Sequence, residues 1–175
     1  MIRTAHTHEL DTEVLAAARA LFVAAFPGEI TDDDWDHGLG GMHALAYAGD
    51  ELVGHASVVQ RRFLYGGRAL RTGYVEAVAV RADQRRRGHG AAMLAALEEV
   101  IRGAYELGAL AATEDGAALY TARGWRHWEG ELYALTPEGV RRTPAEEGDV
   151  FVLEAGVPLD VTRRLTCDWR DGDVW

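Results

Sequence analysis

Apolar residues spaced three or four positions apart predict two helices in the first part of the chain. The longer helix is expected to begin at Asp11 or Thr12, either of which can cap it, and to end at Pro27–Gly28. Its apolar face would carry Leu15, Phe22 and Phe26. A short acidic helix is expected over residues 31–38, because Thr31 can cap it and the acids of its first turn favour the positive end of the helix dipole.

Between residues 42 and 80 the pattern changes to strand-like runs. Three such runs are separated by Gly49–Asp50 and by Gly66–Gly67, and both pairs are typical of tight turns. This segment therefore predicts an antiparallel meander of three strands. The third run contains one glutamate, Glu76, among apolar neighbours.

The rest of the chain alternates between helix-like and strand-like patterns. Helices are expected at about 88–103 and at 114–124, and strands at 108–113, 125–135 and 149–154. The closing segment 167–175 has no periodicity, yet its content of aromatic and acidic residues is unusual for a terminus. The order of elements predicts an α+β fold, and the length of 175 residues favours one domain over 1–175.

The composition narrows the class of protein. No apolar run reaches the roughly 18 residues that a membrane span requires, and the N-terminus lacks the apolar region of a signal peptide. We therefore expect a cytoplasmic protein that does not bind a membrane. The excess of 28 acidic over 18 basic residues disfavours a nucleic-acid partner and suits a cationic ligand. No metal is expected, because the chain has one cysteine, Cys167, and the histidines at 37, 43, 55, 89 and 127 lack metal-ligand spacing.

A basic segment lies at the start of the helix expected at 88–103. It reads Arg85, Arg86, Arg87, Gly88, His89 and Gly90. Unpaired N–H groups at a helix start bind phosphates, glycines let a phosphate approach the backbone, and arginines add forked donors, so these features together indicate a pyrophosphate site. The alternative is a solvated arginine cluster, which would oppose the helix dipole by about 0.3–1 kcal/mol per cation. The glycine pattern fits neither a Walker A loop nor a dinucleotide-binding fingerprint.

The basic segment fits the Arg/Gln-x-x-Gly-x-Gly/Ala signature of the GNAT superfamily of N-acetyltransferases. Over its whole length the chain resembles one family in it, the aminoglycoside 2′-N-acetyltransferases, through stretches that include "GLGGMHAL", "RTGYVE", "LYTARGW" and the ending "CDWRDGDVW". The resemblance implies a GNAT fold: a mixed, mostly antiparallel central sheet flanked by helices, with an acetyl-CoA cleft between splayed central strands. It also implies acetyl-CoA as the cosubstrate, direct transfer to the 2′-amine of a polycationic aminoglycoside, antibiotic resistance, and a homodimer.

The resemblance assigns the basic segment to the pyrophosphate of acetyl-CoA. It further implies that the backbone of Val78, Ala79 and Val80 pairs with the pantetheine arm like an added strand. The Val78 N–H would then polarise the thioester carbonyl.

Two side chains are candidates for proton transfer. Glu76 stands two residues before Val78 on the same strand face, and its carboxylate can accept the proton that an ammonium substrate must lose before it attacks. A structural ion pair with an arginine is the alternative, since an unpaired buried charge costs on the order of several kcal/mol. The resemblance implies the catalytic role. It likewise assigns to Tyr120 the protonation of the departing CoA thiolate, for which a tyrosine packed in the core is the alternative.

Acidic residues are the candidates for binding a polycation, and they are Glu29, Asp34, Glu146, Glu147, Asp173 and the terminal carboxylate of Trp175. Taken alone, each of them could be solvated, and Asp34 could also stabilise its own helix. The resemblance implies a pocket that includes the tail at about 166–175 and is lined by Glu29, Asp34, Glu76, Ala77, Ala111, Ala145, Glu146, Asp173 and Trp175. Two positions depart from the family, since Glu29 replaces an aspartate and Ala111 stands where relatives can offer a hydroxyl. These departures leave the substrate range open.

Three functions are compatible with these features. The first is acetyl-CoA-dependent acetylation of an aminoglycoside 2′-amine. The second is transfer to another amine, such as a cell-wall precursor, a polyamine or a protein N-terminus. The third is a non-catalytic acyl-CoA-binding module, against which the presence of Glu76 and Tyr120 argues.

Overall fold

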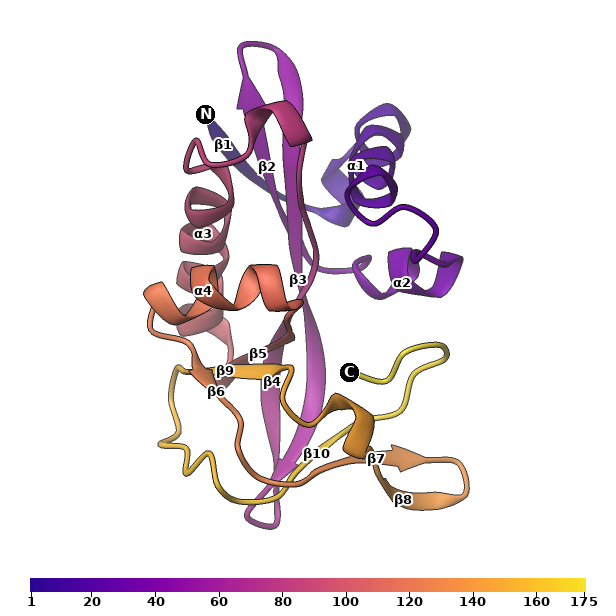
Figure 1. Cartoon of the computed structure of the whole chain (residues 1–175), viewed down its shortest axis with the longest axis vertical. Coiled ribbons are helices and arrows are strands. Elements are labelled where there is room, and N and C mark those ends of the chain that lie inside the picture. The colour runs from indigo at the N-terminus through magenta and orange to yellow at the C-terminus, as the bar shows by residue number, and fades with distance from the viewer. The chain divides into compact units, whose positions relative to one another are not determined.

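The computed structural model describes all residues, 1–175 (Figure 1). The chain divides into two compact units. Unit 1 comprises residues 1–59 and 75–100, and unit 2 comprises residues 60–74 and 101–175. The long strands β3 (Glu51–Tyr65) and β4 (Arg68–Val80) contribute to both units. The expectation of a single domain stays a prediction.

Unit 1 begins with a strand that the sequence pattern did not indicate. β1 (Ile2–His6) pairs antiparallel with β2 (Met42–Ala48), and β2 pairs antiparallel with β3. Of the residues of β1, Ala5 alone is buried. Because β1 is a short strand with one exposed face, it lacks the apolar run that would reveal it.

The two N-terminal helices of unit 1 are capped as their sequences predict. α1 (Thr12–Ala25) has Asp11 as its N-cap, whose Oδ1 accepts a hydrogen bond of 2.8 Å from the Val14 N–H. α2 (Asp32–His37) carries a capping box between Thr31 and Asp34. Figure 1 shows α1 and α2 on one side of β2 and β3, and α3 (His89–Ala104) on the other.

Close packing of α3 against the strands of unit 1 depends on a glycine. A Cβ added at Gly54 of β3 would lie 3.0 Å from Met93 Cε and 3.2 Å from Ala46 Cβ. Glycine therefore permits the close approach of helix and strand. Met93, Leu94 and Leu97 of α3 are fully buried, which confirms the apolar face of the helix expected at 88–103.

Unit 2 is a sheet with the strand order β6-β9-β5-β4-β3-β10-β7-β8. Its parallel pairs are β4 with β5 (Leu107–Ala111) and β10 (Leu165–Cys167) with β7 (Leu132–Thr136). Its antiparallel pairs include β9 (Val150–Glu154) with β5 and with β6 (Arg126–His127), and β8 (Gly139–Arg142) with β7. α4 (Glu114–Ala122) connects β5 to β6.

The predicted α+β order, the meander, the four helices and the strands near 108–113 and 149–154 are confirmed. The segment 125–135 does not form one continuous strand but the two short strands β6 and β7. Between them Gly130 lies against the main chain, since an added Cβ would come within 2.0 Å of Arg163 O. Neither β8 nor β10 was predicted. No helix has the length and apolar composition needed to cross a membrane.

Candidate active site

The basic segment of unit 1 forms a turn that leads from the end of β4 into α3. The Arg81 N–H bonds to Val53 O at 2.8 Å where β4 ends. Arg86 and Gly88 both adopt left-handed backbone conformations, with φ of 59° and 84°. Arg85, directly before Arg86, is extended, with φ of −64° and ψ of 157°. The two positive φ angles turn the chain sharply from the strand into the helix.

The donor groups of this turn fit a pyrophosphate. Arg85, Arg86 and Arg87 are exposed, and the Arg85 Nε donates to Val80 O at 3.1 Å. His89 and Gly90 open a helix of 16 residues, whose first N–H groups point toward the turn. Position 88 requires glycine because of its backbone conformation. An added Cβ would meet no atom within 4 Å, but a residue with a side chain rarely adopts the positive φ of this position.

The last part of β4 exposes every second residue. Glu76, Val78 and Val80 are half-buried, whereas Ala77 and Ala79 are buried against a cluster that includes Phe22 of α1. Ala77 has a φ of 50°, so a left-handed residue lies within β4, directly between Glu76 and Val78. β4 runs through Ala77 as one strand, as the sequence pattern predicted, but that pattern did not indicate a left-handed residue within it.

The two acids assigned to the substrate in unit 1 have different surroundings. Glu29 is exposed in the turn that follows α1. Asp34 is half-buried, and its Oδ2 accepts hydrogen bonds from Thr31 N at 2.7 Å and from Thr31 Oγ1 at 2.8 Å. Asp34 therefore caps its own helix, which was the structural alternative for this residue.

Tyr120 of α4 lies in the aromatic core of unit 2. Its side chain is 7% exposed, and its ring packs against Trp125 and Phe151 with centroid distances of 6.2 Å. Burial raises the pKa of Tyr120 to about 12. The phenol therefore keeps its proton at neutral pH, as a general acid must.

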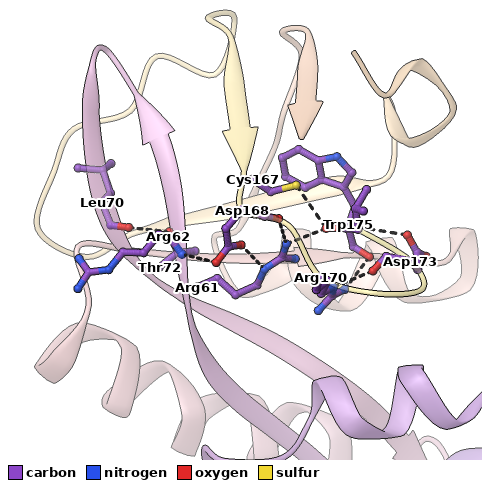
Figure 2. A network of polar contacts seen from close by, with 10 residues as sticks. Arg61, Arg62, Leu70, Thr72, Cys167, Asp168, Arg170, Asp173 and Trp175 are labelled. Carbon is purple, nitrogen blue, oxygen red and sulfur yellow. Dashed lines mark hydrogen bonds and ion pairs between the residues drawn. The ribbon is translucent and has the colours of Figure 1, made fainter. Parts of the chain in front are cut away.

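A buried arginine of β3 fixes the C-terminal segment of unit 2 (Figure 2). Arg61 is 4% exposed, and its Nε donates to Asp168 Oδ1 at 2.8 Å. Its Nη2 donates to Asp168 O at 2.9 Å and to Val174 O at 2.8 Å. Arg170 adds a bond of 3.0 Å from its Nη2 to the main-chain oxygen of Trp175. The segment without periodicity is thus ordered by side-chain hydrogen bonds instead of regular secondary structure.

Trp175 anchors this segment through its side chain. The indole is 3% exposed and packs edge-on against Phe63, with ring centroids 5.2 Å apart. Its Nε1 donates to Thr143 Oγ1 at 2.7 Å. The indole therefore supports the loop that begins at Thr143. Asp173 is exposed, as is Asp171 in the same segment.

Two acids of unit 2, Asp149 and Asp173, lie close enough to the Glu146 carboxylate to repel it. Burial, together with repulsion from Asp173 and Asp149, raises the pKa of Glu146. Glu147 is engaged differently, because it forms a salt bridge of 2.9 Å with Arg142. A bound cation would relieve the repulsion around Glu146, so this is a suitable place for an ammonium group.

The remaining assigned positions of unit 2 are alanines without a polar side chain. Ala145 lies in the short helical turn Pro144–Glu146, and Ala111 is the exposed last residue of β5. Either residue could offer a substrate only main-chain groups and a methyl group.

A family model described as "Acetyltransferase (GNAT) domain" matches residues 6–128. An aminoglycoside 2′-N-acetyltransferase of Mycolicibacterium fortuitum is 51% identical over 177 residues, which cover 99% of this chain and 91% of that protein. The chain belongs to the aminoglycoside 2′-N-acetyltransferase family of GNAT proteins.

Solved GNAT structures share the fold. A GNAT family N-acetyltransferase (YhbS) of Escherichia coli in complex with CoA aligns with a TM-score of 0.64 at 16% identity, over 95% of this chain and 88% of that one. Eis1 of Mycobacterium abscessus aligns with a TM-score of 0.63 at 22% identity, over 76% of this chain and 33% of that one. This chain thus spans about a third of Eis1. The predicted GNAT fold is confirmed.

For a member of this family, each unit holds part of the expected machinery. Unit 1 contains the basic turn and the end of β4, and GNAT acetyltransferases use acetyl-CoA as cosubstrate. Unit 2 contains Tyr120 and brings Glu146 near Asp173. Two features escaped the sequence analysis: the left-handed Ala77 and the buried Arg61. A pair of arginines inside a long strand was a signal for the second, whereas nothing in the sequence marks the first.

Proposed function

We propose that the protein transfers the acetyl group of acetyl-CoA to the 2′-amine of aminoglycosides. The observation that carries this proposal is the likeness to an aminoglycoside 2′-N-acetyltransferase along 99% of the chain. The donor set of the basic turn and the acids of unit 2 support it, because the two substrates are an anion and a polycation.

Binding of the nucleotide is assigned to the basic turn and to β4. The Arg85–Gly90 segment would hold the pyrophosphate with backbone N–H groups and guanidinium donors. The main chain of Val78, Ala79 and Val80 would bond to the pantetheine arm. The Val78 N–H would donate to the thioester oxygen, where negative charge develops during the attack.

The reaction needs one proton acceptor and one proton donor. In this proposal the Glu76 carboxylate takes the proton of the 2′-ammonium, directly or through water, and the amine then attacks the thioester carbon. A C–N bond forms and the C–S bond breaks. The Tyr120 hydroxyl donates its proton to the departing thiolate, and the proton held by Glu76 returns to Tyr120 through solvent. The attacking nitrogen loses a second proton to solvent as the C–S bond breaks. One turnover thus converts an ammonium group and a thioester into a neutral amide, a thiol and one released proton.

Binding of the acceptor is assigned to a set of mainly acidic residues. Glu29, Asp34 and Glu76 belong to unit 1, and Glu146, Asp173 and the loop residue Ala145 to unit 2. Ala77, Ala111 and Trp175 complete the assigned set. Because Trp175 is buried, we propose that it supports the Thr143 loop and leaves contact with the ammonium groups to Asp173.

A thiol-release assay with acetyl-CoA tests the proposal against a panel of amines. We expect CoA release with aminoglycosides that carry a 2′-amine, and NMR of the product should place the acetyl group on that nitrogen. CoA release with polyamines, cell-wall precursors or peptide N-termini, and none with aminoglycosides, would show that the protein is an N-acetyltransferase for another acceptor. CoA binding without release for any amine would leave an acyl-CoA-binding module.

The cellular setting follows from the same assignment. We propose that the protein works in the cytoplasm as a homodimer, without a nucleic-acid or membrane partner, and confers aminoglycoside resistance. Acetyl-CoA is an intracellular metabolite, which supports the location, and the dimer rests on the family resemblance. Sedimentation and the growth of expressing cells on aminoglycosides test these two points.

A further inference from the structure

A row of buried hydrogen bonds in unit 1 ends on the left-handed residue of β4. Thr7 Oγ1 lies 2.8 Å from His43 Nε2, His43 Nδ1 lies 2.8 Å from His55 Nε2, and His55 Nδ1 lies 3.0 Å from Ala77 O. Both imidazoles are fully buried. The four residues come from four separate stretches of chain, so the row links the start of the chain, β2 and β3 to the end of β4.

The carbonyl oxygen of Ala77, at the end of the row, determines which atom donates and which accepts in every bond of the row. A carbonyl oxygen can only accept, so His55 carries its proton on Nδ1 and its Nε2 must accept. His43 then donates from Nδ1, and its Nε2 accepts from the hydroxyl of Thr7. The Thr7 oxygen in turn accepts from the Gly40 N–H at 2.8 Å. One set of tautomers therefore satisfies the whole row. The single hydroxyl proton of Thr7 is then directed to His43 and not to Gly41 O at 3.2 Å, which already accepts from the Thr7 N–H at 3.0 Å.

The row requires both rings to be neutral, and their surroundings keep them so. Burial, aided by repulsion from His6, lowers the pKa of His43 to about 4. Burial, with repulsion from His43, lowers the pKa of His55 to about 4, against the opposing effect of its bond to Ala77. A protonated His55 could no longer accept the bond from His43.

The row does not serve as a path for protons, because a peptide carbonyl has no proton to pass on. Its remaining consequence is mechanical. An alanine with positive φ costs roughly 1–2 kcal/mol, so other contacts must hold it in that conformation. The bond from His55 is one such contact, and the packing of the Ala77 methyl group in the cluster with Phe22 and Trp35 is another. The rings of Trp35 and His55 lie 5.5 Å apart, which joins the two contacts.

We propose that Thr7, His43 and His55 are positioning residues that hold Ala77 left-handed and thereby set the directions of the Glu76 carboxylate and the Val78 N–H. Glu76 and Val78 flank Ala77 directly, so a change of its backbone conformation reorients both groups. The inference rests on the proposed roles of Glu76 and Val78 in acetyl transfer.

A pair of substitutions at His55 separates positioning from packing. His55→Asn can retain a donor near the Nδ1 position, whereas His55→Leu keeps the bulk and loses the donor. We expect His55→Leu to lower kcat by roughly 10- to 100-fold, the scale of a small misplacement of reacting groups, with the aminoglycoside KM nearly unchanged. His55→Asn should stay within about threefold of wild type. Equal kcat for wild type and His55→Leu would overturn the proposal.

Two further variants complete the set. Thr7→Val removes the hydroxyl at the half-buried end of the row, and Thr7→Ser restores it, so the pair remains useful if His55→Leu does not fold. The control is Ser57→Ala on β3, where Ser57 pairs with His43 in register and its buried Oγ has no hydrogen-bond partner. We expect wild-type kcat for Thr7→Ser and Ser57→Ala and a reduced kcat for Thr7→Val. A kcat that falls equally in Thr7→Val and Thr7→Ser would contradict the proposal.

NMR provides a test that does not depend on activity. The ¹⁵N shifts of labelled histidines should show Nδ1–H tautomers for both His43 and His55 at neutral pH, and His55→Leu should move the amide signals of Ala77 and Val78 more than Ser57→Ala does. An Nε2–H tautomer on either ring would contradict the proposed row of hydrogen bonds, and with it the proposal. If Glu76→Gln slows the reaction and His55→Leu does not, the inference alone fails. If the wild type acetylates no amine, the proposed function fails. The histidine tautomers measured by NMR then still test whether the row of hydrogen bonds exists.

Discussion

Glu76 is the residue on which the proposed chemistry depends most. Glu76→Gln keeps the size of the side chain and removes its ability to accept a proton. We expect kcat to fall by roughly 10²- to 10⁴-fold, the usual range for a lost general base, with unchanged affinity for acetyl-CoA. Steady-state kinetics and calorimetry with CoA measure the two quantities. A lower melting temperature with nearly normal turnover would instead identify a structural ion pair.

Tyr120 combines a buried ring with a proton that it holds tightly. Tyr120→Phe should lower kcat by roughly 10- to 100-fold, which is at the low end for acid–base catalysis because a thiolate leaves readily without protonation. The KM for acetyl-CoA should not change. Tyr47→Phe on β2 is the matched control and should behave as wild type. A Tyr120→Phe variant with wild-type kcat would leave Tyr120 as a core residue.

The raised pKa of Tyr120 also predicts how stability depends on pH. Burial raises this pKa from 10.0 to about 12, so the folded state holds the proton more tightly than the unfolded state. The contribution to stability is complete below about pH 10 and is lost as the pH rises through about 12. The free energy of unfolding of the wild type, measured against that of Tyr120→Phe, should therefore fall over this range. A constant difference would mean that Tyr120 ionises as in the unfolded chain.

At single positions the sequence indicated chemistry better than conformation. Arg85–Gly90 was identified because charge and glycine content have meaning at a helix start. Ala77 was not, because alanine rarely adopts positive φ and its conformation here depends on contacts with His55 and Phe22, which are distant in sequence.

At the scale of elements, the turn before α3 is the simplest to test. Arg85→Glu reverses a charge beside the proposed pyrophosphate site and leaves the exposed surface otherwise unchanged. We expect the Kd for CoA to rise by about tenfold or more, since a charge-assisted hydrogen bond contributes roughly 1.5–3 kcal/mol. Arg3→Glu on β1 makes the same charge change at an exposed site of unit 1 and should bind CoA as wild type does. Equal Kd values for the two variants, measured by calorimetry, would contradict the assignment of Arg85 to the pyrophosphate site.

The C-terminal segment allows the substrate role of an acid to be separated from its structural role. Asp173→Asn retains the Oδ1 that accepts the Trp175 N–H at 3.2 Å but removes the charge. We expect the aminoglycoside KM to rise by roughly 3- to 10-fold, as for one lost charge-assisted contact, with the acetyl-CoA KM unchanged. Asp171→Asn changes the same charge in the same segment and is the control. If both KM values of Asp173→Asn match those of wild type, Asp173 does not bind the acceptor.

Long periodic elements were predictable from the sequence, and short strands that depend on distant partners were not. α1, α3 and the meander carry their signals locally, in caps, apolar spacing and glycine turns. β10 has only the residues Leu165–Cys167, and it is a strand because it pairs with β7 on one side and β3 on the other. The order of the segment after β10 depends on Arg61, more than a hundred residues earlier in the chain. No local pattern contains that information.

At the scale of the whole molecule, net charge and orientation determine different steps. The formal charge of −10 attracts any polycation, so attraction does not select a nitrogen. Orientation selects it, because only an amine held within about 3–3.5 Å of the thioester carbon can attack. Two aminoglycosides that differ only in a 2′-amine or a 2′-hydroxyl should therefore both bind, and only the amine should be acetylated. Binding of both should weaken in parallel as salt rises from low to about 0.15 M, where charges beyond about 8 Å are screened. Calorimetry at several salt concentrations and thiol release measure the two effects. Acetylation of the 2′-hydroxyl compound at a comparable rate would refute the 2′ assignment, and salt-independent binding would refute the role of the acids.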